Sequence, residues 1–235
     1  MADSQHMLDI DGRAVPLRVR RHARARRLIL RIDEDGQGAV VTIPKRAAIR
    51  DGVDMAKRKI AWIATQLNRQ PEQVPFVDGA ELPYLGETHT VRHDQTGRGI
   101  RLEGDEIIVA GRTEHLSRRL NDWLKARARE EFSTRAHAKA VSLGRNVRRI
   151  TVRDTKSRWG SCTANGGLNF SWRLVLAPEF VLDYVVAHEV AHLVHRDHGE
   201  AFWALTESLC DGMGEHMNEA KAWLNAHGRN LHIYG

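Results

Sequence analysis

Cysteine is scarce in this sequence, and long apolar runs are absent. Only Cys162 and Cys210 occur among the 235 residues, which is too few for a disulfide framework. The longest apolar runs fall far short of the roughly 20 residues that a membrane-spanning helix needs, and the N-terminal residues do not resemble a signal peptide. These absences argue against a disulfide-stapled secreted protein and against a membrane protein. They predict a soluble protein of the reducing cytoplasm.

Positive charge, by contrast, is plentiful. The chain has 36 Lys and Arg against 30 Asp and Glu, a formal net charge of +6. Such a balance suits anionic partners, so nucleic acid or a nucleotide is one candidate partner class. Seven arginines crowd the first predicted strands: Arg18, Arg20, Arg21, Arg24, Arg26, Arg27 and Arg31. No aromatic residue lies among them to stack on bases. The favoured interpretation is therefore solvated charge that discourages edge pairing, and the alternative is a phosphate-contacting arm.

The hydrophobic pattern predicts an α+β fold in two parts. Strands are expected within residues 8–44, 77–109 and 150–174, and those of residues 77–109 should form a small antiparallel unit. Helices are expected over residues 47–69, 114–143, from Pro178 onward, 200–209 and 215–226. Residues 1–7 are polar and unpatterned, so we expect a frayed terminus there. The predicted domains are a β-rich N-terminal region with one helix over residues 1–112 and a second domain over residues 113–235.

One short motif carries the chemistry: His188-Glu189-x-x-His192 matches the zinc-hydrolase pattern H-E-x-x-H. Residues four apart lie on one face of a helix, so the two imidazoles can bind one metal ion from the same side. Glu189 would then lie beside the ion, where it can accept a proton from a water molecule. The composition gives an expected chance count of about 0.05 for this motif. Histidines that merely face solvent or the core are therefore the weaker interpretation.

A catalytic zinc ion takes three protein ligands and leaves one position for water. His198 matches the longer spacing H-E-x-x-H-x-x-G-x-x-H, although His195 replaces the glycine. Continuous helix would carry His198 about 9 Å beyond His192, so it can bind only if the helix ends between them. The segment 196–199 offers such an exit, and His195, which continues the helix face, is the rival ligand. Three neutral imidazoles favour one Zn²⁺ ion over Mg²⁺.

Several segments together resemble a known family. They are Lys156-Ser-Arg-Trp-Gly-Ser-Cys162, Leu168-Asn-Phe-Ser-Trp-Arg-Leu174, Asp183-Tyr-Val-Val-Ala-His-Glu-Val-Ala-His192, Asp197-His198 and Phe202-Trp203. With them the chain resembles the YgjP-like metallopeptidases, relatives of the SprT-like and WLM zinc proteins. The resemblance implies a zincin-like catalytic domain, with an active-site helix under a small antiparallel sheet. It also implies that His188, His192 and His198 are the metal ligands and that Glu189 is the catalytic glutamate. Ser171 and Cys210 depart from the family pattern, which leaves the substrate open.

The resulting hypothesis is a zinc-dependent hydrolase that cleaves a peptide or protein. Its candidate substrate-binding residues are Lys156, Arg158, Trp159 and Tyr184. An extended peptide would pair with the edge strand near residues 159–162. Three alternatives stay open. The site could hydrolyse nucleotides, with Lys156 and Arg158 holding phosphates; the protein could be a DNA-associated protease, as SprT-like enzymes are; or the zinc ion could be purely structural.

Overall fold

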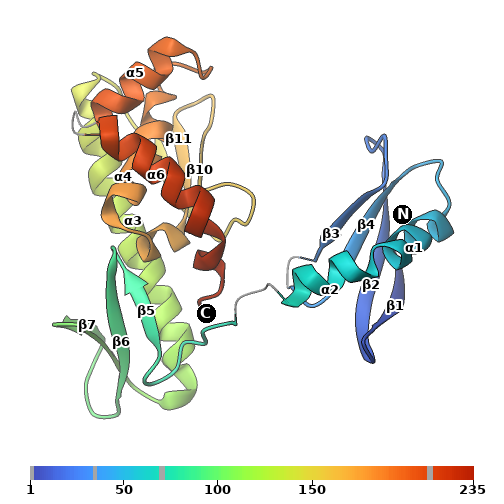
Figure 1. Cartoon of the computed structure of the whole chain (residues 1–235). Coiled ribbons are helices and arrows are strands. Elements are labelled where there is room, and N and C mark those ends of the chain that lie inside the picture. Colours follow the sequence, from blue (N-terminus) through green and yellow to red (C-terminus); the bar gives the residue numbers. More distant parts are fainter. Residues whose placement is uncertain (1–2, 34–35, 69–71, 211–213) are drawn as a thin grey trace. The chain divides into compact units, whose positions relative to one another are not determined.

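The computed structural model describes residues 3–33, 36–68, 72–210 and 214–235. Contacts divide the chain into two compact units, Met1–Pro71 and Glu72–Gly235 (Figure 1). Both units combine helices with small sheets, so the predicted α+β class is confirmed. In the part of the chain that is described, no helix has the length and apolar character needed to cross a bilayer.

The first unit is a four-stranded sheet with two helices on one face. Its strands lie in the order β1 (Ser4–Ile10), β2 (Arg13–His22), β4 (Ala39–Pro44) and β3 (Ile29–Ile32), and β2 runs parallel to β4. The helices are α1 (Ile49–Arg58) and α2 (Ile60–Asn68). Alternate residues of the strands are buried with Ala56 and Ile63 of the helices in one apolar core. The other face of the sheet carries arginines such as Arg18 and Arg31, together with Val40 and the exposed Met7.

Two details of this unit differ from the sequence prediction. Residues 1–7 were expected to be frayed, yet β1 begins at Ser4, whose backbone pairs opposite Val19 of β2. Residues 4–7 are mostly polar, so they lack the alternation of apolar and polar residues by which a strand is recognised in a sequence. Their pairing is made by the backbone. The single helix expected over residues 47–69 is two helices that meet at Lys59. The backbone there, at φ −111° and ψ 19°, leaves the α-helical range.

The second unit opens with another four-stranded sheet, in the order β5 (Glu81–Tyr84), β6 (Glu87–Asp94), β8 (Glu106–Ala110) and β7 (Ile100–Glu103). An antiparallel sheet was expected here, but β6 and β8 run parallel, so the sheet is mixed. A short turn of 3₁₀ helix, η1 (Thr113–His115), leads into the long helix α3 (Leu116–Ser142). The helix predicted over residues 114–143 is therefore confirmed.

The contact boundary at residue 71 lies well before the predicted domain boundary at residues 112 and 113. The reason is that the sheet β5–β8 and helix α3 bury the same core. Leu82, Val91 and Ile107 of the sheet belong to one apolar cluster with Leu120 and Leu124 of the helix. A sequence pattern shows that each element has an apolar face, but it does not show which faces meet.

The remaining elements carry or surround the histidine motif. A three-stranded sheet has the order β10 (Gly160–Cys162), β11 (Gly167–Ser171) and β9 (Arg149–Arg153), and helices α4 (Glu179–Ala191), α5 (Glu200–Leu209) and α6 (Gly214–His227) follow. The small sheet was expected to be antiparallel, but β11 and β9 run parallel. The strand expected to reach residue 174 ends at Ser171 and passes into the 3₁₀ helix η2 (Trp172–Leu176). A last 3₁₀ helix, η3 (Gly228–His232), follows α6.

Helix α3 holds α4 and the small sheet in place (Figure 1). Asp183 of α4 accepts from Lys139 of α3 at 2.9 Å and lies 3.8 Å from Arg135. Phe132 of α3 stacks on Phe170 of β11 with ring centroids 4.5 Å apart. The ion pairs of Asp183 are little exposed. Together with the stacked rings they position the helix that carries the candidate site.

Candidate metal centre

Helix α4 presents two imidazoles on one face. The helix was expected to start at Pro178, which is its N-cap residue, and His188 and His192 lie one turn apart with ring centroids 5.0 Å apart. The helix is apolar on nearly all sides because it is buried, with Val186, Val190 and their neighbours in the core. The histidine pair is therefore held by a rigid, buried element and not by a surface loop.

The chain then turns sharply and brings a third imidazole to the pair. Helix α4 ends at Ala191, and α5 begins at Glu200 after Gly199. The guanidinium of Arg196 donates to the carbonyl oxygens of Thr163 and Ala164, each at 2.9 Å, and so ties this exit segment to the turn between β10 and β11. The helix thus ends before His198, as the sequence required, but it ends at Ala191 with His192 as its C-cap, which is earlier than the exit expected at residues 196–199.

The spacing of the three rings fits one metal ion. The Nε2 atoms of His188 and His198 are 3.3 Å apart, and one nitrogen from each of His188, His192 and His198 lies within 4.8 Å of the others. Two nitrogens bound to the same tetrahedral zinc ion at 2.0–2.1 Å would be about 3.3 Å apart. His195 is not part of this cluster within the described chain, so its ring is not brought to the pair.

Neighbouring groups favour the metal-binding form of these rings. The Nδ1 atom of His192 lies 2.9 Å from the carbonyl oxygen of His195, which fixes Nδ1 as a donor and leaves Nε2 free to bind. Burial, with the imidazoles of His192 and His198 nearby, lowers the pKa of His188 to about 4. A neutral imidazole is the form that binds a metal ion. His195 thus contributes its backbone, whereas the sequence suggested its side chain as a rival ligand.

Glu189 is buried beside this cluster without an ionic partner. Glu189 is only 5% exposed, and its Oε2 atom has no hydrogen-bond partner among the described residues. Burial raises the pKa of Glu189 to about 7, and the positive charge of Arg158 opposes that shift. An unpartnered buried carboxylate is costly to a fold. A buried carboxylate of this kind is a candidate for binding a ligand or for taking part in a reaction.

Strand β10 covers Glu189 closely at Gly160. A Cβ atom at position 160 would lie 2.5 Å from Oε1 and 2.6 Å from Cγ of Glu189. The glycine is therefore needed for the close approach of the strand to the carboxylate. The sequence predicted an edge strand near residues 159–162, but it did not identify Glu189 as the neighbour of Gly160.

We expect Gly160→Ala to displace Glu189 and to lower peptide hydrolysis on the order of 10²-fold, since misplacing a catalytic group by about 1 Å costs that much. Bound metal per chain should stay unchanged, because no ligand is touched. The matched control is Gly52→Ala in the first unit, where a Cβ atom would meet Val19 at 2.8 Å. That variant should lower stability and leave the activity per folded molecule intact. Full activity in Gly160→Ala would contradict this role of the close contact.

Aromatic side chains form the wall behind the imidazoles. Phe202 of α5 is fully buried and stacks on His192 at a centroid distance of 4.5 Å. Tyr184, one turn before His188, has its ring 6.0 Å from that imidazole. The ammonium of Lys221 lies 3.9 Å from the centroid of the Trp203 ring. Sequence reasoning did not identify Lys221, because nothing in the sequence signals that this face of α6 meets the active-site helix.

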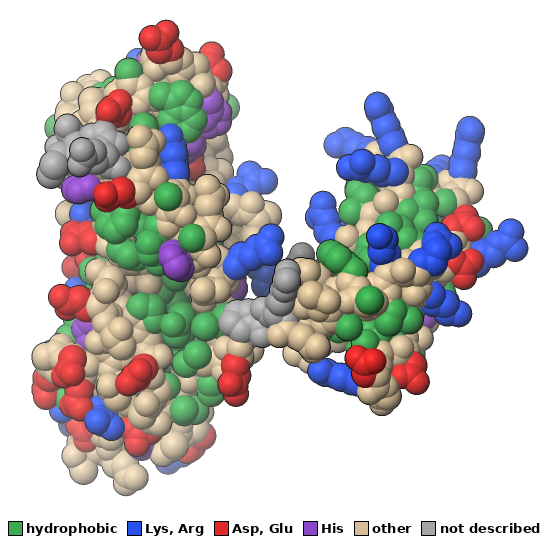
Figure 2. Space-filling model, in the orientation of Figure 1, with side chains coloured by type: hydrophobic (Ala, Val, Ile, Leu, Met, Phe, Trp, Pro, Cys, Tyr) green, Lys and Arg blue, Asp and Glu red, His purple; other side chains and the backbone are tan. Residues whose placement is uncertain are grey.

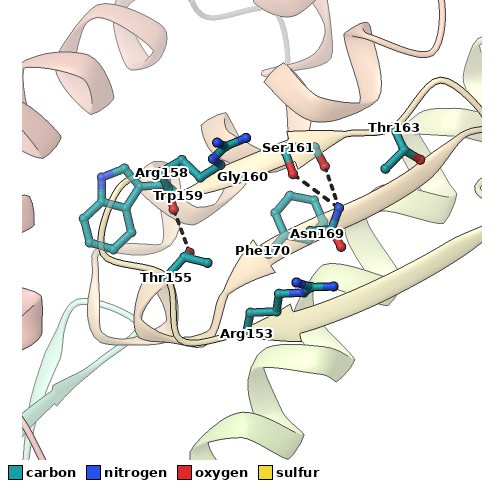
Figure 3. A pocket seen from close by; sticks show the side chains of 9 residues that line it. All are labelled: Arg153, Thr155, Arg158, Trp159, Gly160, Ser161, Thr163, Asn169 and Phe170. Carbon is teal, nitrogen blue, oxygen red and sulfur yellow. Dashed lines mark hydrogen bonds between the residues drawn. The ribbon is translucent and has the colours of Figure 1, made fainter. Parts of the chain in front are cut away.

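A cavity of about 250 Å³ lies on the small sheet where β10 begins (Figure 3). It is lined by Arg153, Thr155, Arg158, Trp159, Gly160, Ser161, Thr163, Asn169 and Phe170. Of the predicted substrate-binding residues, Arg158 and Trp159 line this cavity and Tyr184 lies beside His188. Lys156 is exposed and is not part of the lining. The Trp159 ring stacks on His232 with centroids 5.4 Å apart, so it also packs the C-terminal segment.

Other candidates lie near the centre without joining it. Cys162 is half-buried, its Sγ donates to the Thr163 carbonyl at 3.5 Å, and it does not belong to the histidine cluster. Asp183 is paired with α3, and Asp197 accepts from the Gly199 backbone N–H. Neither carboxylate therefore orients an imidazole. Asp211 and Met213 lie outside the described residues.

Converging imidazoles around a buried carboxylate are the arrangement that metal-dependent hydrolases use. A family model described as YgjP-like, metallopeptidase domain, matches residues 26–227. The chain belongs to this family of metallopeptidases, as the resemblance implied. The match reaches into both compact units. No curated protein and no solved structure matches the chain.

Proposed function

We propose that this metallopeptidase is a zinc enzyme in which His188, His192 and His198 bind one Zn²⁺ ion and Glu189 is the general base. The observation that carries the proposal is the convergence of three imidazole nitrogens beside a buried, unpartnered carboxylate. Nitrogen ligands in a compact tripod suit Zn²⁺ and disfavour Mg²⁺, which prefers oxygen ligands in octahedral geometry. The three nitrogen donors are therefore the reason for proposing Zn²⁺.

In this mechanism the residues of the chain orient and move protons. A zinc ion held by the three imidazoles would polarise the scissile carbonyl group and acidify the attacking water. Glu189 accepts the proton of that water and later passes it to the leaving amine. Burial raises the pKa of Glu189 to about 7 in the chain without a metal ion, and the positive charge of a bound zinc ion would lower that pKa and favour the ionised form that accepts a proton. Arg158 and Tyr184 are the nearby candidates for stabilising the oxyanion.

The peptide substrate is proposed to bind along strand β10. This strand forms one edge of the three-stranded sheet, and Gly160 at its start lies against Glu189. An extended peptide that adds to this edge would have its backbone fixed by main-chain hydrogen bonds. Its scissile bond would then lie beside the carboxylate. The cavity next to Arg158 and Ser161 would receive a side chain of that peptide.

The proposal is tested by metal removal and a comparison of substrate classes. We expect the zinc-loaded protein to cleave unfolded protein or a peptide library, to lose that activity when a chelator removes the ion, and to regain it with one equivalent of zinc. Nucleoside triphosphates should stay intact under the same conditions. Zinc-dependent release of phosphate or pyrophosphate without peptide cleavage would instead favour the nucleotide phosphohydrolase. A protein inactive on both, with zinc bound, would favour a structural ion.

A further inference from the structure

The net positive charge of the chain belongs to its first unit. Residues 1–71 contain 15 Lys and Arg and 8 Asp and Glu, whereas residues 72–235 contain 21 Lys and Arg and 22 Asp and Glu. Figure 2 shows many Lys and Arg side chains projecting from this unit with few acidic ones beside them, and both signs mixed on the other unit. A small unit with a net charge of +7, in a chain whose other unit has a net charge of −1, is typical of a protein that binds an anionic partner.

Strand topology gathers these cations at one end of the sheet. Because β2 and β4 are parallel and His22 pairs opposite Pro44, the segments that follow both strands leave the sheet at the same end. Strand β3 also begins there, with Ile29 opposite Thr42. The cations at this end form what we call the basic end: Arg20, two residues before the end of β2, and Arg24, Arg26, Arg27, Lys45 and Arg46 in the segments that follow β2 and β4. All six residues are exposed.

The basic end has few acidic neighbours. Asp3 precedes Ser4, which pairs opposite Val19 of β2, so one carboxylate lies near this end, and it belongs to no ion pair within the described chain. Residues 12–32 and 36–50 contain no Asp or Glu. Within the described chain, the ion pairs of this unit join Arg18 to Asp33 and Arg50 to Asp51, and none involves a member of the basic end. Arg21, just behind it, donates to the carbonyl oxygens of Lys45 and Ala47 and so fastens the two segments together. The cluster is thus braced by backbone contacts while its charges face solvent.

We propose that the basic end of the first unit binds the phosphodiester backbone of a nucleic-acid duplex without regard to base sequence. Regularly placed Arg and Lys side chains neutralise phosphates and release counterions, which supplies sequence-independent affinity. The absence of aromatic residues among the arginines disfavours stacking on unpaired bases. The exposed large apolar residues of this unit, Met7 and Trp62, lie outside the basic end. A membrane surface is therefore the poorer partner, since interfacial binding adds apolar insertion.

This inference does not depend on the proposed zinc chemistry. The basic end and the histidine cluster lie in different compact units and share no residue. A failure of nucleic-acid binding would leave peptide hydrolysis untouched, and an inactive metal centre would leave the binding surface intact. The two proposals can therefore be judged separately on the same purified full-length protein.

The test measures binding of the full chain to fluorescent 20-base-pair duplexes of random sequence, one of DNA and one of RNA, over a range of salt concentrations. With about six phosphate contacts, the slope of log K against log salt should be about −5. The triple variant Arg24→Gln, Arg26→Gln, Arg27→Gln should weaken binding on the order of 10²-fold at 0.1 M salt and reduce the slope by about 3. The tighter of the two duplexes identifies the source of the phosphates.

A control variant removes the same charge elsewhere. Arg98→Gln, Lys125→Gln, Arg145→Gln takes three exposed cations from the second unit, and none of the three belongs to an ion pair in the described chain. It should bind both duplexes within about twofold of wild type, and both triple variants should keep wild-type peptide hydrolysis. Equal losses in the two variants would overturn the proposal, as would binding to anionic phosphatidylserine vesicles without binding to either duplex.

Discussion

Glu189→Gln is expected to lower kcat/KM for peptide hydrolysis by about 10³-fold, within the range that a positioned general base supplies. The amide of glutamine nearly matches the shape of the carboxylate but cannot accept the proton of the attacking water. Because the three imidazoles are unchanged, the variant should still hold one zinc ion per chain. The measurements are steady-state kinetics with a peptide substrate and metal analysis of the same sample.

The stability of this variant should not fall. Glu189 is buried and its Oε2 atom has no hydrogen-bond partner among the described residues. Replacing an unpaired buried carboxylate by a neutral group of the same size removes a desolvation cost. A matched control is Glu207→Gln, which removes the same charge from the exposed face of α5 and should leave activity unchanged. If Glu189→Gln kept full activity with its zinc ion bound, the carboxylate could not be the base.

The shared orientation of His188 and His192 could be predicted from the sequence, because residues four apart lie on the same face of a helix. The pair His188 and His192 needs nothing but 3.6 residues per turn to face one point. His198 could be selected over His195 by a geometric condition, the end of the helix, and α4 does end at Ala191. Local rules thus identified the three imidazoles that the fold brings together. Their role as metal ligands stays a prediction.

The parts that the sequence did not predict depend on contacts between distant segments. The strand at Gly160 covers Glu189, and Lys221 approaches Trp203, only because helices and sheet meet in one particular way. The parallel pairing of β6 with β8 and of β9 with β11 was missed for the same reason. Short strands give the same alternating pattern in either direction, so pairing partners and direction are settled by the tertiary core.

The fold of the first unit changes how its arginines are interpreted. From the sequence, the arginines between residues 18 and 31 were best explained as solvated edge charge. The parallel pairing of β2 with β4 adds Lys45 and Arg46 to the same end, where no acidic residue of the adjoining segments balances them. A linear run of charge becomes a compact surface only once the register is known, and compact positive surfaces bind phosphate backbones.

His198→Ala should weaken zinc binding by more than 100-fold. Losing even an outer partner that orients a ligand costs 10–100-fold in metal affinity, and this change removes a nitrogen that lies 3.3 Å from Nε2 of His188. Two imidazoles on one helix would then have to hold the ion with water in the vacated positions. Competition with a chromophoric chelator measures the affinity, and hydrolysis should fall in step with zinc occupancy.

His195→Ala is the control that makes this result specific. Its ring stays outside the histidine cluster, and its contact with His192 is made by the backbone carbonyl, which alanine retains. That variant should therefore bind zinc like wild type, and zinc should raise its melting temperature as it does for wild type, because an ion bound only to the folded state stabilises it. The reverse pattern, with zinc lost in His195→Ala and kept in His198→Ala, would mean that the segment after α4 folds differently around the ion. The close approach of His198 to His188 would then have no role in metal binding.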